Sequence, residues 1–121
     1  MEFNSNKSIF LQIADNISEQ VLNGTYPPGE KIPSVRELAA EMGVNPNTIV
    51  RTYNELQSLK IVDNKRGIGY FVTTQAPKII KERKKTTFFN KILPEVSRQA
   101  SLLGISTKEI KMRLDQALTV T

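Results

Sequence analysis

The sequence predicts a mostly α-helical fold with one small β-hairpin. Three observations predict it. Residues 32–57 read as two short helices joined by a tight turn, residues 61–72 as two β-rich runs around a polar connection, and residues 78–119 as two amphipathic helices. We therefore expect an N-terminal winged helix-turn-helix in residues 1–75 and a C-terminal two-helix dimerisation hairpin in residues 76–121.

An amphipathic helix is expected over residues 8–23, ahead of the helix-turn-helix. Its apolar residues recur at spacings of three and four: Ile9, Phe10, Ile13, Ala14, Ile17 and Val21. Asn23-Gly24 favours the end of this helix, and the turn-rich residues 25–29 separate it from the next element. Three helices should therefore form a small bundle.

The first helix of the helix-turn-helix has a clear start signal. Ser34 and Glu37 have the spacing of a capping box, in which each side chain accepts a hydrogen bond from the backbone N–H of the other. Gly43 follows where the end of a helix favours a residue that tolerates positive φ. The apolar face between these signals is expected to consist of Val35, Leu38, Ala39 and Met42.

The second helix presents a polar face that is a candidate binding site. Asn45 occupies the N-cap position, Pro46 the first helical position, and Ile49, Tyr53 and Leu56 form the apolar stripe. At 100° per residue, the opposite face consists of Asn47, Arg51, Asn54 and Ser58, flanked by Thr48 and Val50. Asn, Arg and methyl-bearing side chains at a helix N-terminus can pair with adenine, guanine and thymine in the major groove. For this face alone, an ordinary polar surface helix is an equal alternative.

A hairpin directly after such a helix is typical of a wing. Its strands are expected at residues 61–62 and 69–72, around the turn-prone residues 63–67. The tip is Lys65-Arg66-Gly67, where cations beside a glycine can approach a phosphate or a minor groove closely. The alternative is a solvated tip, but the preceding helices favour the wing.

The tail carries two apolar stripes. The first, from Phe89 to Leu103, steps alternately by four and three residues and is a heptad seam. Gly104 closes this helix, and a second capping box at Ser106 and Glu109 opens the last helix, whose apolar residues are Ile110, Leu114, Ala117 and Leu118. The stripes exceed what two helices can hide from each other, so a second copy of the chain is the simplest partner. The expected dimer interface consists of Phe89, Leu93, Val96, Ala100, Leu103, Ile110 and Leu114. Folding of the tail onto its own winged domain is the alternative.

Two further features of the tail leave alternatives open. Pro77 can open its first helix, and residues 78–85 carry five cations against one acid. These cations either lie along a DNA backbone or form a solvated helix face, which we slightly prefer. Pro94 removes one helical hydrogen bond, so the long helix either kinks near Asn90, as we expect, or breaks there.

Composition excludes several classes of function. The chain has no Cys and no His, which removes disulfides, thiol and imidazole catalysis and the common zinc ligands. We expect no enzymatic activity, no metal and no cofactor. Because no apolar run has the length of a membrane span and the start is polar, we expect a cytoplasmic protein. The net charge of +5 resides in the tail: residues 1–75 carry seven basic and eight acidic side chains, and residues 76–121 carry ten and four.

The motifs of residues 7–72 resemble the winged-helix domain of GntR-family bacterial transcription regulators. The segments that carry the resemblance are Ile9–Ala14, Leu22–Gly24, Pro28-Gly29, Ile32–Ala39, Val44–Thr48, Tyr53, Leu56 and Arg66–Val72. The Val44–Thr48 turn and the short tail are similar to the YtrA subfamily, whose members dimerise through two C-terminal helices.

The resemblance implies a role for individual residues. Arg36 would contact the DNA backbone or an adjacent base, residues 45–51 would start the reading helix, and Gly67 and Gly69 would shape the wing. Many members have Arg where this chain has Pro46 and Val50, so the outward-facing Arg51 is the better candidate for a base contact. The candidate DNA-contacting residues are Ser34, Arg36, Asn45, Asn47, Thr48, Arg51, Lys65, Arg66 and Gly67.

We therefore expect a homodimeric, sequence-specific DNA-binding regulator, a repressor of a palindromic double-stranded operator. The resemblance also implies that short members of this family look like repressors of operons that encode transporters. The alternative is a winged-helix protein-interaction module without specific DNA readout. The chain has no room for the effector domain of larger members, and the sequence leaves open an unidentified small molecule between the winged domain and the tail.

Overall fold

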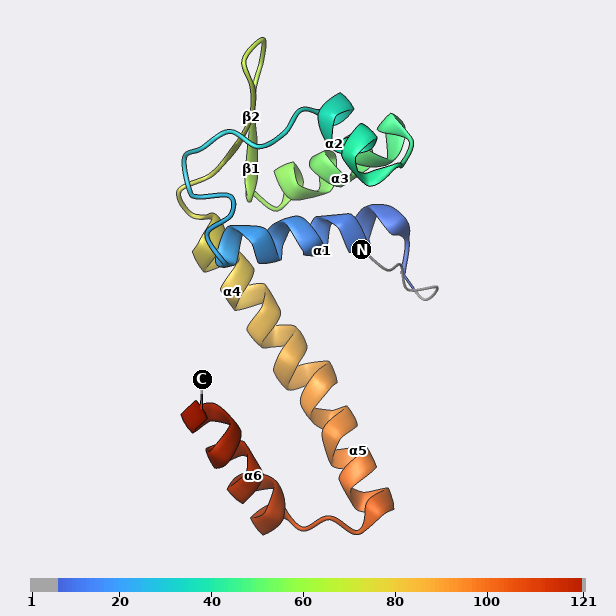
Figure 1. Cartoon of the computed structure of the whole chain (residues 1–121), viewed down its shortest axis with the longest axis vertical. Helices are drawn as coiled ribbons and strands as arrows, with labels where there is room; N and C mark the ends of the chain where they lie inside the picture. Colours follow the sequence, from blue (N-terminus) through green and yellow to red (C-terminus); the bar gives the residue numbers. More distant parts are fainter. Residues whose placement is uncertain (1–6, 121) are drawn as a thin grey trace. The chain divides into compact units, whose positions relative to one another are not determined.

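The computed structural model describes residues 7–120, apart from the side chain of Val120, and confirms a mostly helical fold with one small antiparallel sheet (Figure 1). The elements in chain order are α1 (Ile9–Leu22), α2 (Val35–Met42), α3 (Pro46–Ser58), β1 (Val62–Lys65), β2 (Gly69–Val72), α4 (Ala76–Thr87), the π-helical segment η1 (Phe88–Ile92), α5 (Leu93–Leu103) and α6 (Thr107–Val120). The chain divides into two compact units, the first ending at Arg83 and the second beginning at Lys84.

Helix α1 buries the expected face, with one correction at its start. Ile13, Ile17 and Val21 are buried, whereas Ile9 is exposed and Phe10 is only half-buried. The apolar stripe is therefore narrower at its N-terminal end than the spacing predicts. The helix ends at Leu22, and the N–H of its C-cap residue Asn23 donates to the Glu19 carbonyl at 2.9 Å.

Helix α2 begins with the predicted capping box. The Ser34 N–H donates to Glu37 Oε1 at 2.9 Å, and the Glu37 N–H donates to Ser34 Oγ at 3.1 Å. The hydrogen bond from the Ser34 N–H to the carboxylate is the largest cause that holds the pKa of Glu37 below its ordinary value. Gly43 ends the helix with φ of 68°, in the left-handed region that glycine adopts without steric cost.

Removing the Ser34 hydroxyl tests the capping box. Ser34→Ala should lower the free energy of unfolding by about 0.5–2 kcal/mol, because the Glu37 N–H loses its acceptor. Ser8→Ala is the matched control, since Ser8 is the N-cap of α1 but its side chain makes no capping hydrogen bond. Urea unfolding followed by circular dichroism gives both values. Equal losses would show that Ser34 does not stabilise through its cap.

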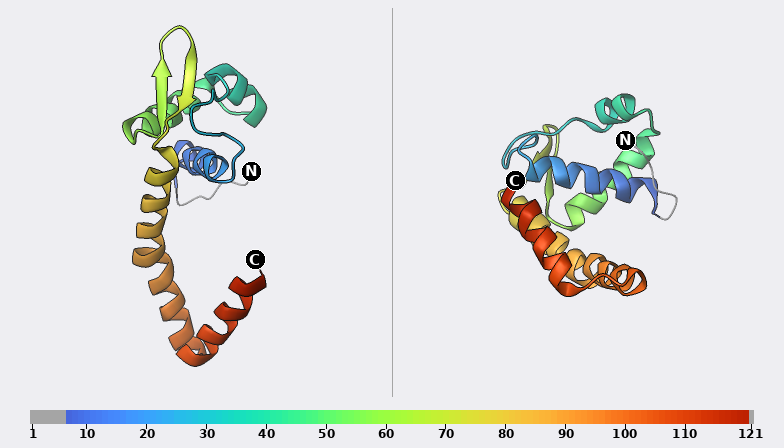
Figure 2. Two further views of the ribbon diagram at one scale, coloured as in Figure 1. Left: turned by 90° about the vertical axis from the view of Figure 1, so that its left-hand side faces the viewer. Right: turned by 60° about the horizontal axis from the view of Figure 1, so that its bottom comes forward.

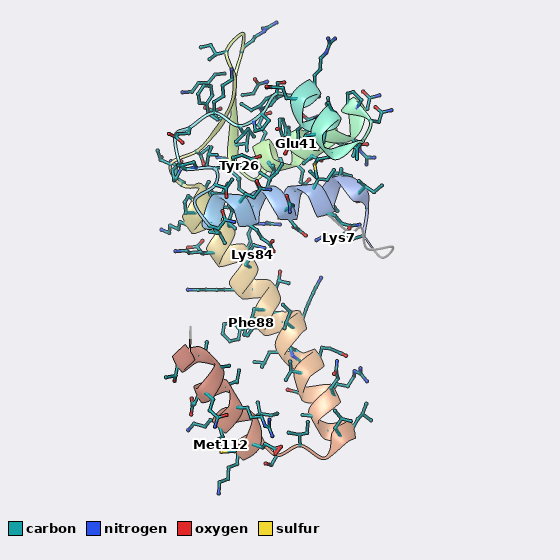
Figure 3. All side chains as sticks on the ribbon, viewed as in Figure 1. Lys7, Tyr26, Glu41, Lys84, Phe88 and Met112 are labelled. Atoms are coloured by element: carbon teal, nitrogen blue, oxygen red, sulfur yellow. The ribbon has the colours of Figure 1, made fainter. Side chains whose placement is uncertain are left out.

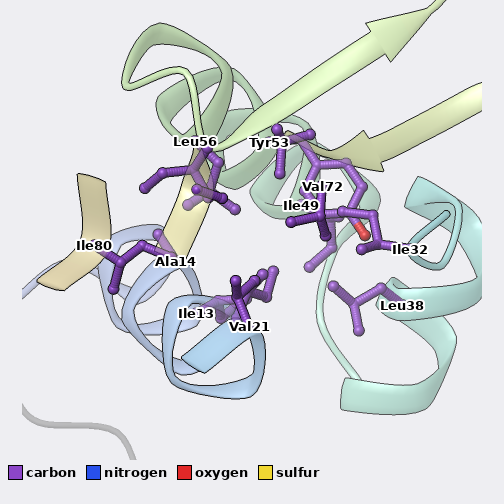
Figure 4. Packing of buried hydrophobic residues seen from close by; sticks show 14 of the residues in the cluster. Ile13, Ala14, Val21, Ile32, Leu38, Ile49, Tyr53, Leu56, Val72 and Ile80 are labelled. Atoms are coloured by element: carbon purple, nitrogen blue, oxygen red, sulfur yellow. The ribbon is translucent and has the colours of Figure 1, made fainter. Parts of the chain in front are cut away.

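The core of the first unit lies where α1, α2, α3, the hairpin and the start of α4 meet (Figure 4). Ile13 and Ile49 are completely buried, and Leu56 and Ile80 are buried nearly as well. Full burial of a side chain of this size stabilises a fold by about 1.5–3 kcal/mol. Ala76 and Ile80 belong to this core, so the beginning of α4 packs with the first unit.

The hairpin is paired on both sides of β2. Val62 lies opposite Val72 and Lys65 opposite Gly69 in the antiparallel β1–β2 ladder. On the other edge of β2, the Ile32 N–H donates to the Tyr70 carbonyl at 2.9 Å, and Lys31 forms an isolated bridge with Phe71. This third segment, which no local signal in the sequence predicts, joins the chain before α2 to the wing.

Pro94 does not break the long helix. The π-helical turn η1 joins α4 to α5, and its last bond runs from the Leu93 N–H to the Phe88 carbonyl. Pro94 follows in the first turn of α5. A π turn is a recognised site of helix bending, and η1 includes Asn90. Of the two alternatives, the break is therefore wrong, and a local distortion of the helix precedes the proline.

The turn between α5 and α6 follows its sequence signals in part. Gly104 ends α5 with φ of 68°, and the Glu109 N–H donates to Ser106 Oγ at 3.1 Å. Within residues 7–120, the Glu109 side chain returns no hydrogen bond to Ser106. The second capping box is thus only half formed.

The helices of the second unit expose most of their apolar side chains. Phe89, Leu93, Val96 and Leu103 are between 42 and 70% exposed, and Leu114 is 52% exposed. Of the other two residues expected at the dimer interface, Ile110 is half-buried and Ala100 is buried. Phe88 and Met112, labelled in Figure 3, are exposed as well.

Candidate nucleic-acid interface

Helix α3 presents its first turns to solvent. The Asn45 side chain accepts a hydrogen bond from the Asn47 N–H at 2.8 Å, and Pro46 takes a position that requires no N–H donor. Asn45, Asn47 and Arg51 are exposed, and Thr48 is half-buried. The predicted polar face is therefore available to a partner at the N-terminal end of α3.

Tyr53 fixes α3 to the rest of the first unit. Its hydroxyl donates to the Pro33 carbonyl at 2.6 Å, and its ring centroid lies 4.6 Å from that of Tyr70 on β2. The side chain has no exposed surface, and burial raises the pKa of Tyr53 well above its ordinary value. The phenol stays protonated and keeps donating, so it links α3 to the segment before α2 and to the wing.

The other side of α3 is attached to the start of α1. The buried Thr52 hydroxyl lies 2.9 Å from the Thr48 carbonyl and 3.1 Å from the Phe10 carbonyl. The guanidinium carbon of Arg51 lies over the Phe10 ring, 4.2 Å from its centroid. Periodicity assigned Phe10 to the apolar stripe of α1 and could not predict its contact with Arg51, because the two residues are far apart in the chain.

The wing presents the predicted cations at its tip. Lys65, Arg66 and Gly67 are exposed, and the Ile68 N–H donates to the Lys65 carbonyl at 2.8 Å to close the turn. The Lys65 ammonium lies over the Phe71 ring at 4.5 Å. Ile68 is 63% exposed beside these cations, which the sequence analysis did not anticipate.

Lys31 is a further cation of the wing that sequence reasoning missed. A Cβ atom built on Gly69 would lie 2.5 Å from Lys31 Cε, so the lysine side chain passes directly over the backbone at Gly69. A glycine inside a strand is the sequence signal of such a close approach. Lys31 is exposed and carries its charge to the same sheet as Lys65.

Substitution of Gly69 should destabilise the wing. Its φ of 143° is rarely adopted by residues with a side chain, so Gly69→Ala should cost about 1–3 kcal/mol in the free energy of unfolding. Urea unfolding of Gly69→Ala and of Gly69→Ala/Lys31→Ala separates strain from crowding. Recovery of the wild-type stability in the double variant would show that contact with Lys31, and not φ, causes the loss.

The candidate residues of the first unit come from elements on one side of α1. Figures 1 and 2 show α2, α3 and the β1–β2 hairpin together on that side. Arg36 on α2 is exposed, whereas Ser34 is half-buried and its side chain is engaged in the capping box. The elements that carry these exposed cations, α2, α3 and the wing, therefore share one side of α1.

Other kinds of site find no support in the part of the chain that is described. Across residues 7–120, no group of three or more acidic side chains is arranged to hold a metal ion. No helix among these residues is long and apolar enough to span a membrane.

A helix stabilised by a buried tyrosine, preceded by a capped helix and followed by a cationic hairpin, defines a winged helix-turn-helix protein. The model of the bacterial regulatory proteins of the gntR family matches residues 10–72. The chain belongs to the GntR family of DNA-binding transcriptional regulators, as the resemblance predicted.

Named relatives and a solved structure agree with this assignment. The chain is 40% identical to the transcriptional regulator YhcF of Bacillus subtilis, over 90% of this chain and 88% of that protein. It is 39% identical to the transcriptional repressor YtrA of the same organism, over 88% of this chain and 81% of that protein. A crystal structure of a GntR-family protein from Bacteroides thetaiotaomicron has a TM-score of 0.76 and 41% identity, covering 93% of this chain and 97% of that one.

Proposed function

We propose that this regulator is a homodimeric repressor that binds a palindromic operator through two copies of α3. The observation that carries the proposal is the exposed, carboxylate-free start of α3 in a unit that also carries a cationic wing, in a member of a DNA-binding family. The assignment as a repressor is supported by the similarity to the repressor YtrA.

Each candidate residue has a role that follows from its place. Asn47 and Arg51 would read base edges in the major groove, and Thr48 would pack against a thymine methyl group. Lys65, Arg66 and Gly67 would contact phosphates or the minor groove. Ser34, Arg36 and Asn45 would contact the DNA at the ends of the two helices.

The tail would hold the two reading helices at a fixed separation. Exposed apolar side chains on α5 and α6 need a cover, and a second copy brings an identical apolar surface. Ile110 and Leu114 also line an open apolar hollow of about 550 Å³, together with Ile105, Glu109 and Arg113. A twofold dimer would place the reading helices about one duplex turn, or a multiple, apart.

Fluorescence anisotropy tests this function directly. The full chain is titrated into a duplex from upstream of its own gene and into a shuffled duplex, over a series of salt concentrations. A repressor of its own operon should bind the native duplex about a thousandfold tighter, with a steep salt dependence. Equal and weak binding to both duplexes would mean either that the operator lies elsewhere or that α3 is a docking surface, and the next search would be for a protein partner.

Replacing Arg51 tests whether α3 reads sequence. Arg51→Ala should weaken binding to the specific duplex by about 1–3 kcal/mol, because the bidentate contact of a guanidinium with a base is lost. The loss on shuffled DNA should be smaller. Lys65→Ala is the control, since loss of a phosphate contact should weaken both duplexes alike. Equal losses on both duplexes for Arg51→Ala would remove Arg51 as a specificity residue.

A further inference from the structure

We infer that Phe10 is a positioning residue for Arg51, whose guanidinium it holds over its ring so that the N–H donors are oriented before DNA arrives. The inference rests on the proposed function, because it requires Arg51 to read a base of the operator. The Arg51 guanidinium carbon lies 4.2 Å from the centroid of the Phe10 ring. A cation over an aromatic face at this distance is attracted by the quadrupole of the ring.

The Phe10 ring is a fixed support because the Phe10 backbone carbonyl accepts a hydrogen bond from α3. Thr52, which has no exposed surface, places its hydroxyl 3.1 Å from the Phe10 carbonyl and 2.9 Å from the Thr48 carbonyl. Thr52 directly follows Arg51 in the sequence. The hydrogen bond of Thr52 therefore joins the start of α1 to α3 at the position next to Arg51.

The contact leaves the chemistry of Arg51 available. A guanidinium has five N–H donors, so one aromatic ring against it cannot engage them all. Within residues 7–120, no hydrogen bond or ion pair engages Arg51, which is exposed. A carboxylate in the place of Phe10 would instead compete with the DNA for the same donors.

Holding Arg51 in advance should increase affinity even if Phe10 does not touch DNA. A long side chain that is free in the unbound protein must be ordered at the interface, and this ordering weakens binding. Phe10 orders Arg51 beforehand. Its effect should therefore be confined to the base pair that Arg51 reads and should disappear when Arg51 is absent.

The experiment uses the full chain and a duplex selected with it from a random library. Anisotropy then gives the affinities of the wild type, Phe10→Leu, Arg51→Ala and the double variant, on the selected duplex and on duplexes with each base pair replaced. Phe10→Leu keeps an apolar side chain in this half-buried position and removes the aromatic face. Phe10→Tyr keeps the face. Phe71→Leu is the control, because it removes the ring beneath Lys65 instead.

Phe10→Leu should weaken binding to the selected duplex about two- to fivefold, because Arg51 must then be ordered when the DNA binds. It should also reduce the preference at the base pair that loses preference in Arg51→Ala. Phe10→Leu should have no effect in the Arg51→Ala background, Phe10→Tyr should retain affinity, and Phe71→Leu should leave that base preference unchanged.

Two results would overturn the inference. One is an equal loss for Phe10→Leu with and without Arg51, and the other is a loss spread over all base pairs, since either would indicate general destabilisation. A random library from which the wild type enriches no sequence would instead contradict the proposed function. The two failures are therefore distinguishable.

Discussion

Replacing Tyr53 with alanine should lower the free energy of unfolding of the first unit by about 3–5 kcal/mol, the largest loss that we expect from a single core substitution. The side chain has no exposed surface, packs on Tyr70 and donates to the Pro33 carbonyl at 2.6 Å. Its removal leaves a cavity and a carbonyl without its donor. A domain of this size has a stability of about 5–15 kcal/mol, so the loss would unfold a large share of the chains on mild heating.

Tyr53→Phe separates the two causes. It keeps the ring and removes only the hydroxyl, so it should cost about 1–3 kcal/mol through the unsatisfied Pro33 carbonyl. Urea unfolding by circular dichroism, at one fixed protein concentration because the chain is proposed to dimerise, gives both values. A cost for Tyr53→Ala no greater than that for Tyr53→Phe would show that the ring contributes little and would contradict the assignment of Tyr53 to the core.

Local signals in the sequence were sufficient for most of the fold. Ser34 with Glu37, Asn45 with Pro46, and Gly43 act within one helical turn, and the structure confirms each of these signals. The polar face of α3 followed from helical periodicity for the same reason, because burial of Ile49 and Leu56 determines which side remains exposed. The structure confirms that the polar face is exposed at Asn47, Arg51, Asn54 and Ser58. The contacts of this face with DNA remain predictions.

Contacts between distant segments could not be predicted in this way. Phe10 lies beneath Arg51 and Lys31 crosses the wing at Gly69 only because the folded chain brings these segments together. Periodicity assigned Phe10 to the apolar stripe of α1, where it is only half-buried. The π turn before Pro94 could not be predicted either. A proline in the sequence indicates that one helical hydrogen bond is missing, but not how the backbone accommodates the loss.

Replacing Leu93 with aspartate should dissociate the proposed dimer and weaken operator binding about a hundredfold to ten-thousandfold. An ionised carboxylate would be buried in the apolar seam without a partner, which costs more than the contact can return. The monomers would lose the second half-site, and linking two binding modules contributes a factor of about 10²–10⁴ to affinity. Analytical ultracentrifugation gives the mass, and anisotropy on the operator gives the affinity.

Leu102→Asp is the matched control for this prediction. Leu102 lies on the same helix, is 73% exposed against 42% for Leu93, and follows it by nine residues, which is half a turn away on the helix surface. The same charge on that opposite face should leave both mass and affinity unchanged. If Leu102→Asp also dissociated the dimer, the seam would not be the interface. A monomeric wild type would contradict the proposed dimer. It would favour the alternative, in which the tail folds onto its own winged domain and so covers the heptad seam.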